Sequence, residues 1–132
     1  MPWQGRRYLD GGVADSIPYE AVGRLGYDRR VVILTRDLEY RKRPMPRAAV
    51  RAMYGKYPVF CQRLLNRHTV YNASVARLAA LEKAGEIFVL RPSQPITVHR
   101  LERDPAALQA VYDLGVKDAH TRLAALKDYL SK

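Results

Sequence analysis

Two unbroken apolar runs constrain the fold most strongly. They are Val31-Val32-Ile33-Leu34 and Ile87-Phe88-Val89-Leu90, each bounded by polar or turn-forming residues. Such runs are typical of strands that are covered on both faces, as in a parallel sheet flanked by helices. We therefore expect an α/β fold with a partial parallel sheet of two to four strands.

Further short strands are predicted around these runs. Tyr8-Leu9, before a glycine turn, is predicted to be a strand, and a helix over about 17–25 would connect it to the 31–34 strand in a βαβ unit. Asp15 or Ser16 would cap that helix. Ile96-Thr97-Val98 would add a short edge strand.

A long helical insertion is expected at about 46–84. Pro58 should divide it into two helices, because a proline inside a helix removes a hydrogen bond and clashes with the preceding turn. Val75 and Leu78 fall at helical spacing on a predicted inner face, and Gly85 would close the segment.

The C-terminal part is predicted to be helical as well. Asp104-Pro105 would begin a helix and Gly115 would end it. The final helix carries an apolar stripe that we expect to dock on the sheet; it consists of Val116, Ala119, Leu123, Leu126 and Leu130.

The predicted strands are few for a domain of this class. Parallel strands need cover on both faces, and such sheets commonly contain five or more strands. No element is predicted to cover the edge of the first strand. We therefore expect the chain either to be part of a larger domain or to form a homo-oligomer through this uncovered sheet edge.

Composition narrows the protein class. The 132 residues are 48% apolar and 27% charged, which is a globular composition of about one domain. The single cysteine, Cys61, and three scattered histidines provide no metal-ligand set of usual spacing. With no secretion signal or membrane-spanning run, we expect a cytoplasmic protein, peripheral at most to the inner face of a membrane.

The net charge of +10 is concentrated in one segment. Residues 36–67 hold nine basic and two acidic residues, which leaves only +3 for the rest of the chain. Aromatic and methionine residues lie between these charges, a pattern that favours contact with anionic lipid. The candidate contacts are Arg41, Lys42, Arg43, Arg47, Arg51 and Lys56. A solvated face whose long Arg side chains cover apolar surface explains the same pattern equally well.

Two other binding functions fit a basic chain. Arg41-Lys42-Arg43-Pro44 could contact nucleic-acid phosphates. However, the sequence has no helix-turn-helix, ribonucleoprotein or zinc-finger pattern, so charge alone supports nucleic acid, and we do not favour it as a partner. A protein-interaction module remains the other alternative.

One carboxylate stands where α/β sheets bind their ligands. Asp10 follows the predicted 8–9 strand, and ligands of open α/β sheets lie at the carboxyl ends of strands. Gly11 and Gly12 would allow the backbone to turn sharply there. Taken alone, Asp-Gly-Gly is also a common turn in which the aspartate bonds its own backbone.

A family resemblance adds to this interpretation. The string DGGVADSIP, followed by a helix and VVILTR, resembles the second half of a bacterial patatin-like phospholipase domain. The likeness extends over nearly the whole chain, through YRKRP at 40–44, LLNRHTVYN at 64–72, IFVLRPS at 87–93 and RLERDPAALQAVYDLG at 100–115.

The resemblance implies a function. Patatin-like enzymes are lipid acyl hydrolases that use a Ser-Asp dyad and neither a metal nor an organic cofactor. By this likeness Asp10 would be the dyad acid, Gly11 and Gly12 its loop, and a phospholipid or other lipid ester the substrate.

The serine partner of the dyad is not found in this chain. In the family the nucleophile lies in G-x-S-x-G at a strand-to-helix turn. None of the four serines has glycines at the positions two before and two after it; they are Ser16, Ser74, Ser93 and Ser131. We therefore expect residues 1–132 to be the C-terminal portion of a patatin-like domain, which supplies the acid but does not hydrolyse esters alone.

Overall fold

The computed structural model describes residues 2–99 and 101–131. They form two compact units, each made from two chain segments. The first unit consists of Met1–Glu20 and Arg41–Arg77, and the second of Ala21–Tyr40 and Leu78–Lys132. Helix α3 (Pro58–Lys83) has its residues up to Arg77 in the first unit and those from Leu78 in the second.

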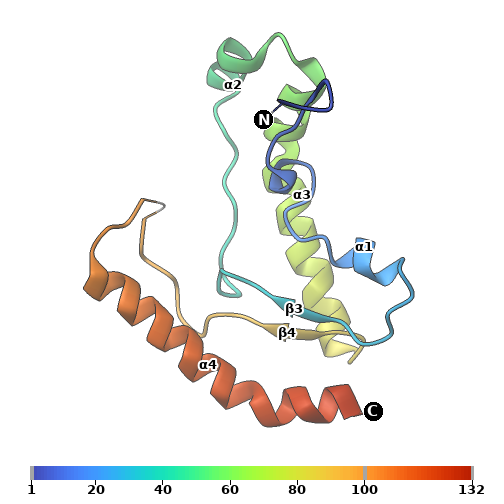
Figure 1. The fold of residues 1–132 in the computed structure, drawn as a ribbon, viewed down its shortest axis with the longest axis vertical. Coiled ribbons are helices and arrows are strands. Elements are labelled where there is room, and N and C mark those ends of the chain that lie inside the picture. Colours follow the sequence, from blue (N-terminus) through green and yellow to red (C-terminus); the bar gives the residue numbers. More distant parts are fainter. Residues whose placement is uncertain (1, 100, 132) are drawn as a thin grey trace. The chain divides into compact units, whose positions relative to one another are not determined.

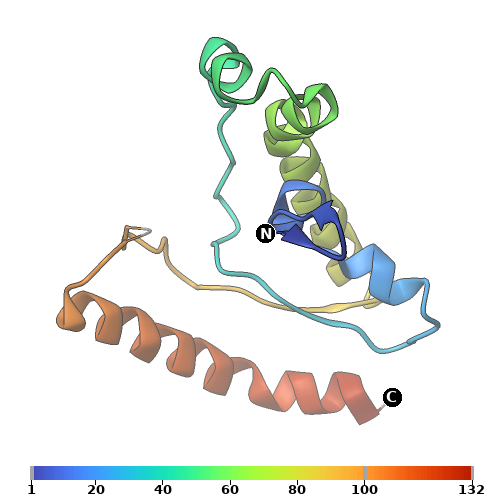
Figure 2. The same cartoon turned by 45° about the horizontal axis from the view of Figure 1, so that its top comes forward.

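The two apolar runs pair as a parallel sheet in the second unit. β3 (Val31–Ile33) lies beside β4 (Phe88–Leu90), with Val32 opposite Val89 (Figures 1 and 2). Backbone hydrogen bonds extend the pairing, since the Leu34 amide donates to the Leu90 carbonyl at 2.8 Å. The mixed helix-and-strand class and both predicted strands are confirmed, but the sheet has only these two strands in the described residues.

Helix α4 (Pro105–Ser131) packs against β4 through one tyrosine. The Tyr129 ring is buried, with its centroid 5.7 Å from that of Phe88. Its hydroxyl donates to the carbonyl of Glu86 at 3.0 Å and accepts from the amide of Arg30 at 3.1 Å. Tyr129 therefore fixes α4 to the backbone just before each strand begins.

The predicted docking stripe of α4 is mostly exposed. Val116, Ala119, Leu123 and Leu130 are exposed and Leu126 is partly buried, so the prediction that the whole stripe packs on the sheet is wrong. The face that contacts β4 carries Tyr129 and Arg122, whose guanidinium carbon lies 4.8 Å from the centroid of the Phe88 ring. Burial of the Tyr129 ring, with two hydrogen bonds to backbone groups next to the strands, therefore decides which face of α4 packs, and the regular spacing of the aliphatic residues does not.

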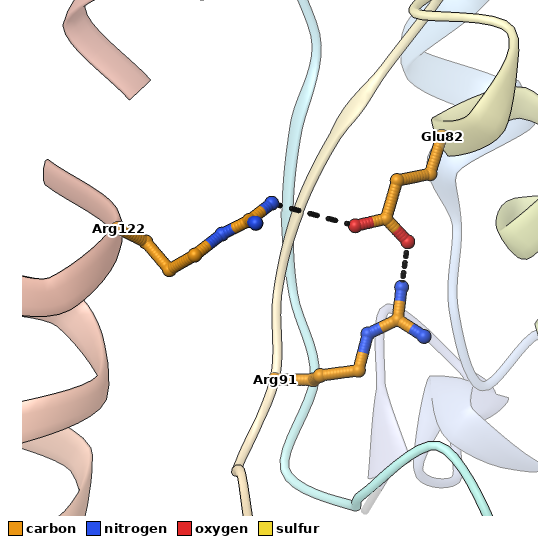
Figure 3. Close-up of polar contacts among 3 residues, drawn as sticks. All are labelled: Glu82, Arg91 and Arg122. Atoms are coloured by element: carbon orange, nitrogen blue, oxygen red, sulfur yellow. Dashed lines mark hydrogen bonds and ion pairs between the residues drawn. The ribbon is translucent and has the colours of Figure 1, made fainter. Parts of the chain in front are cut away.

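An ion cluster connects three elements of the second unit (Figure 3). Arg91, just after β4, binds the carboxylate of Glu82 on α3, and both side chains are largely buried. Arg122 on α4 approaches the other oxygen of that carboxylate, with 3.6 Å between Nη2 and Oε1. Glu82 thus sits between two guanidinium groups, which hold α3, the end of β4 and α4 together.

The first unit begins with a hairpin. β1 (Pro2–Trp3) pairs antiparallel with β2 (Arg6–Arg7), and the turn residues Gln4 and Gly5 both have positive φ. Tyr8-Leu9 forms no strand, so the predicted βαβ unit that starts there is wrong. The backbone passes directly from β2 into the capped turn at Asp10, which leaves no length for a further strand. Ile96-Thr97-Val98 forms no strand either.

Some of the helix ends predicted from proline and glycine are found in the structure, and others are not. α1 (Tyr19–Gly23) is shorter than the helix predicted at 17–25. The two helices predicted over about 46–84 are present as α2 (Arg47–Tyr54) and α3, which begins at Pro58. Gly85 follows α3 with a φ of +75°, which favours glycine. Gly115, however, lies inside α4 and ends no helix.

A small core holds the first unit together. Val50 of α2 and Cys61 and Leu64 of α3 are buried against one another. Tyr54 and Phe60 pack beside them in an edge-to-face contact with ring centroids 5.0 Å apart. Four partly buried apolar side chains pack against this core, namely Val13, Tyr54, Phe60 and Leu65. The loop that follows Asp10 is therefore attached to the same core as α2 and α3.

Candidate functional site

Asp10 begins a short capped turn. The turn is the 3₁₀ helix η1 (Gly11–Val13), and its cap is the Asp10 side chain, whose Oδ1 accepts from the Gly12 amide at 2.8 Å. The Asp10 carbonyl also accepts from the Val13 amide at 3.1 Å. Oδ2 of Asp10 has no hydrogen-bond partner within residues 2–99 and 101–131, and the side chain is exposed. The loop therefore orients the carboxylate through one oxygen and leaves the other accessible.

A residue of α3 holds this loop from the other side. Arg67 Nε donates to the Gly12 carbonyl at 2.8 Å, and the Ser16 hydroxyl donates to the same oxygen at 2.7 Å. Arg67 Nε and Ser16 Oγ are themselves 3.4 Å apart. Arg67 was not among the residues predicted from the sequence, because nothing in the local pattern relates residue 67 to residue 12.

Of the two glycines of the motif, Gly12 is the one whose position leaves little room for a side chain. A Cβ on Gly12 would lie 3.2 Å from Oδ1 of Asp10 and 3.4 Å from Nη2 of Arg67, whereas a Cβ on Gly11 would meet nothing within 4 Å. Both neighbours of Gly12 are held by hydrogen bonds. Gly12 is thus the position where the absence of a side chain brings Asp10 and Arg67 close to the same backbone.

An open groove of about 590 Å³ lies beside Asp10. One wall is the loop around Asp10, and the other is the turn between α2 and α3 with the first residues of α3. Its lining is mainly apolar with two basic side chains; it comprises Leu9, Asp10, Gly11, Val13, Ala14, Lys56, Tyr57, Pro58, Val59, Phe60 and Arg63. The groove combines one carboxylate, two cations and an apolar floor.

A smaller hollow of about 290 Å³ in the same unit is more polar. Ser16, Asn66 and Arg67 line it, together with Gln62. The Ser16 hydroxyl is committed to the Gly12 carbonyl and makes no hydrogen bond to the Asp10 carboxylate. Asp15 and Ser16 were the alternative caps predicted for α1; Asp15 Oδ1 accepts from the Ile17 amide at 3.1 Å, just before α1, whereas the Ser16 hydroxyl donates to the Gly12 carbonyl.

The predicted lipid contacts differ in their surroundings. Among them, Lys42 is partly buried: its amide donates to Oδ1 of Asn72 at 2.9 Å, and its carbonyl accepts from Nδ2 of Asn72 at 3.1 Å. Its Nζ lies 4.7 Å from the centroid of the Tyr71 ring. The other five are exposed, namely Arg41, Arg43, Arg47, Arg51 and Lys56.

Among residues 2–99 and 101–131, no three His, Cys, Asp or Glu side chains cluster as a metal site would require. In the same part of the chain, none of the helices combines the length and the apolar character that a membrane span requires.

Comparisons with known proteins give one match. The family described as "Domain of unknown function (DUF6363)" matches residues 57–131, from the residue before α3 to the end of α4. The matched range includes Arg67 and the Glu82 ion cluster, and it begins after the Asp10 loop. No curated protein and no solved structure gives a significant match. Because the match covers more than half of its length, the chain belongs to the DUF6363 family.

Proposed function

We propose that this chain is the C-terminal part of a patatin-like serine acyl hydrolase and that Asp10 is the acid of its Ser-Asp dyad. The observation that carries the proposal is the environment of the Asp10 carboxylate. Oδ1 is held by the Gly12 amide, Oδ2 lacks a hydrogen-bond partner in the described residues, and Asp10 borders a mainly apolar groove. A dyad needs such a carboxylate, oriented by its own loop and accessible to a serine hydroxyl.

The proposed reaction is acyl transfer in two steps. As the serine oxygen bonds to the ester carbon, its proton passes to the Asp10 carboxylate and then to the departing alcohol. Water next attacks the acyl-serine, gives its proton to Asp10 and releases the fatty acid, after which the serine recovers its proton. In the groove, Val13 and Phe60 would contact the acyl chain, while Lys56 and Arg63 would pair with a headgroup phosphate.

The serine in this proposal comes from a G-x-S-x-G segment outside residues 1–132. The Ser16 hydroxyl, the one nearest Asp10 in sequence, donates to the Gly12 carbonyl instead. Acyl transfer also needs hydrogen-bond donors for the oxyanion, which the family provides from an earlier glycine-rich loop. Residues 1–132 alone are therefore proposed to be inactive.

Exposed apolar surface in the second unit supports an additional polypeptide partner. Ile33 of β3 is 73% exposed, and Leu123 and Leu130 of α4 are also exposed. The edge of β3 that faces away from β4 pairs with no strand in the described residues. We assign this surface to the nucleophile-bearing part of the domain.

The same surface supports the second candidate, a protein-interaction module that forms a homo-oligomer through the β3 edge. Light scattering of residues 1–132 separates the two candidates. The hydrolase proposal predicts that Ile33→Asp leaves a monomer unchanged, whereas a wild-type dimer that becomes a monomer on this substitution favours the interaction module.

Labelling with a fluorophosphonate probe tests the dyad. In the complete gene product the probe is expected to label the serine of a G-x-S-x-G motif, and Asp10→Asn should slow labelling by at least about 100-fold. Asp15→Asn is the matched control and should label at the wild-type rate, because the Asp15 carboxylate accepts from the Ile17 amide, a bond that an asparagine oxygen can also accept. Residues 1–132 alone should stay unlabelled, and labelling of one of their four serines would contradict the proposal.

A further inference from the structure

The segment around α2 is strongly basic. Residues 40–81 contain nine Lys or Arg residues and no Asp or Glu. Arg47, Arg51 and Lys56 from this range are exposed. No acidic side chain within these 42 residues offsets the charge, so this stretch of surface attracts anions.

Exposed apolar side chains lie between these basic residues. Met45 is 45% exposed, and Met53 and Val59 are each 71% exposed. Scattered exposed apolar residues are ordinary in soluble proteins, but here all three occur within the 15 residues that also carry Arg47, Arg51 and Lys56. We name the six residues together the basic-apolar surface.

The outward face of α2 is apolar as well. Val50 points into the core and is 1% exposed, with Tyr54 partly buried one turn later. The far side of the helix therefore carries small apolar residues flanked by Arg51 and Met53; these are Ala48, Ala49 and Ala52, all exposed. No charge occupies the centre of that face, so it is suited to a partly apolar environment.

This surface is held in place by the fold. The Cys61 thiol of α3 donates to the Tyr54 carbonyl at the end of α2. Before α2, Asn72 of α3 bonds both the amide and the carbonyl of Lys42. Both ends of the segment are thus attached to α3, so binding of a partner should cost little conformational entropy in this segment.

We infer that the basic-apolar surface docks on an anionic phospholipid bilayer. Arg47, Arg51 and Lys56 lie among the headgroup phosphates, and the side chains of Met53 and Val59 enter the boundary with the acyl chains. A nucleic acid would satisfy the charges but offers no apolar layer for Met53. The bilayer is the one partner whose surface combines dense negative charge with adjacent hydrocarbon.

Docking here would also explain where a substrate enters. Lys56 and Val59 belong both to this surface and to the lining of the groove beside Asp10. A bilayer bound at this surface would therefore meet the groove directly. This last step rests on the proposed hydrolase function, whereas the docking itself does not, and Asp10→Asn, which removes a negative charge beside the groove, should not weaken membrane binding.

Co-sedimentation with vesicles tests the inference. The chain should sediment with vesicles of equimolar phosphatidylcholine and phosphatidylglycerol, remain in solution with phosphatidylcholine alone, and be released by salt. The double variant Arg51→Gln/Lys56→Gln should bind roughly 20-fold more weakly, since each basic residue near the surface contributes about fivefold. Met53→Ser should also weaken binding, by about fivefold or more, through lost apolar burial.

Matched controls alter the same properties elsewhere. Arg103→Gln/Lys117→Gln removes two exposed charges, and Leu101→Ser removes an apolar side chain that is 86% exposed. Both should bind within about twofold of wild type. The inference would be overturned if the control variants lost as much binding as the test variants. It would also be overturned if the chain bound phosphatidylcholine vesicles as tightly as the anionic vesicles, or bound neither kind of vesicle. Tighter binding to DNA than to vesicles, unaffected by Met53→Ser, would instead assign the surface to nucleic acid.

Discussion

Arg67 Nε donates to the carbonyl of Gly12 at 2.8 Å, although the two residues are 55 positions apart in sequence. The contact joins α3, which lies inside the DUF6363 match, to the Asp-Gly-Gly loop, which lies outside it. The loop that carries Asp10 is therefore held by a helix inside the DUF6363 match, although the loop itself lies outside that match. In the proposed dyad Arg67 would be a positioning residue, since its hydrogen bond goes to the Gly12 backbone and not to the Asp10 carboxylate.

Arg67→Met is expected to destabilise the chain by about 1–3 kcal/mol, because it removes a partly buried charged donor from the Gly12 carbonyl. Urea unfolding followed by circular dichroism measures the loss. Arg77→Met on the same helix is the control; Arg77 is exposed and should cost less than about 0.5 kcal/mol. An equal loss of unfolding free energy in the two variants would show that the hydrogen bond from Arg67 to Gly12 does not stabilise the chain.

The two glycines of the motif should respond in opposite ways to alanine. Gly12→Ala forces its Cβ against Asp10 and Arg67 and should destabilise the chain by about 1 kcal/mol or more. Gly11→Ala enters open space, so its effect should lie between zero and about 1 kcal/mol of stabilisation, from the restricted unfolded chain. Thermal unfolding of the two variants side by side checks the order, and a reversed order would show that the loop has another conformation.

Tyr129→Phe should cost about 1–2 kcal/mol, because it leaves the Glu86 carbonyl and the Arg30 amide without their shared hydroxyl. Tyr112→Phe is the matched control on the same helix, since that ring is 66% exposed, and it should be neutral within about 0.5 kcal/mol. Chemical unfolding of both variants gives the comparison. A neutral Tyr129→Phe would mean that α4 is not fixed to the strands through this hydroxyl.

Tyr19 should make stability fall at high pH. Burial, together with the Glu20 carboxylate, raises the pKa of the Tyr19 phenol above its ordinary value of 10.0. The folded state therefore holds the proton more tightly than the unfolded state. Its contribution is complete below pH 10.0 and is lost as the pH rises through the elevated pKa. The free energy of unfolding of Tyr19→Phe should decline less over that range than that of wild type, and parallel curves would refute the assignment.

The features that the sequence predicted correctly are those set by local chemistry. The apolar runs at 31–34 and 87–90 became β3 and β4, because their β-branched and aromatic residues favour strands. The expectation that both strands are covered on both faces is wrong for β3, where Ile33 is 73% exposed. Pro58 divides the helical insertion since its ring cannot follow a helical turn. Asp104 bonds the Ala106 amide at the start of α4, as a cap should.

The errors concern interactions between distant residues. Gly115 stays inside α4 because one glycine costs a helix only about 1 kcal/mol relative to alanine, and the remainder of the 105–131 helix outweighs that cost. The apolar stripe of α4 was predicted to pack on the sheet from the spacing of its residues alone. That spacing gives no information on hydrogen bonds to distant residues, such as those of Tyr129. For the site, Asp10 and its glycines could be chosen from the motif, but Arg67 could not, since the fold alone brings it to Gly12.

Phospholipid hydrolysis by the complete gene product tests the central claim most directly. Release of fatty acid from phosphatidylglycerol vesicles should be readily measurable for wild type and for Asp15→Asn. Asp10→Asn should lower the turnover number by at least about 100-fold without weakening vesicle binding. Wild-type turnover by Asp10→Asn, or a complete gene product without any G-x-S-x-G serine, would contradict the assignment of Asp10 as the dyad acid.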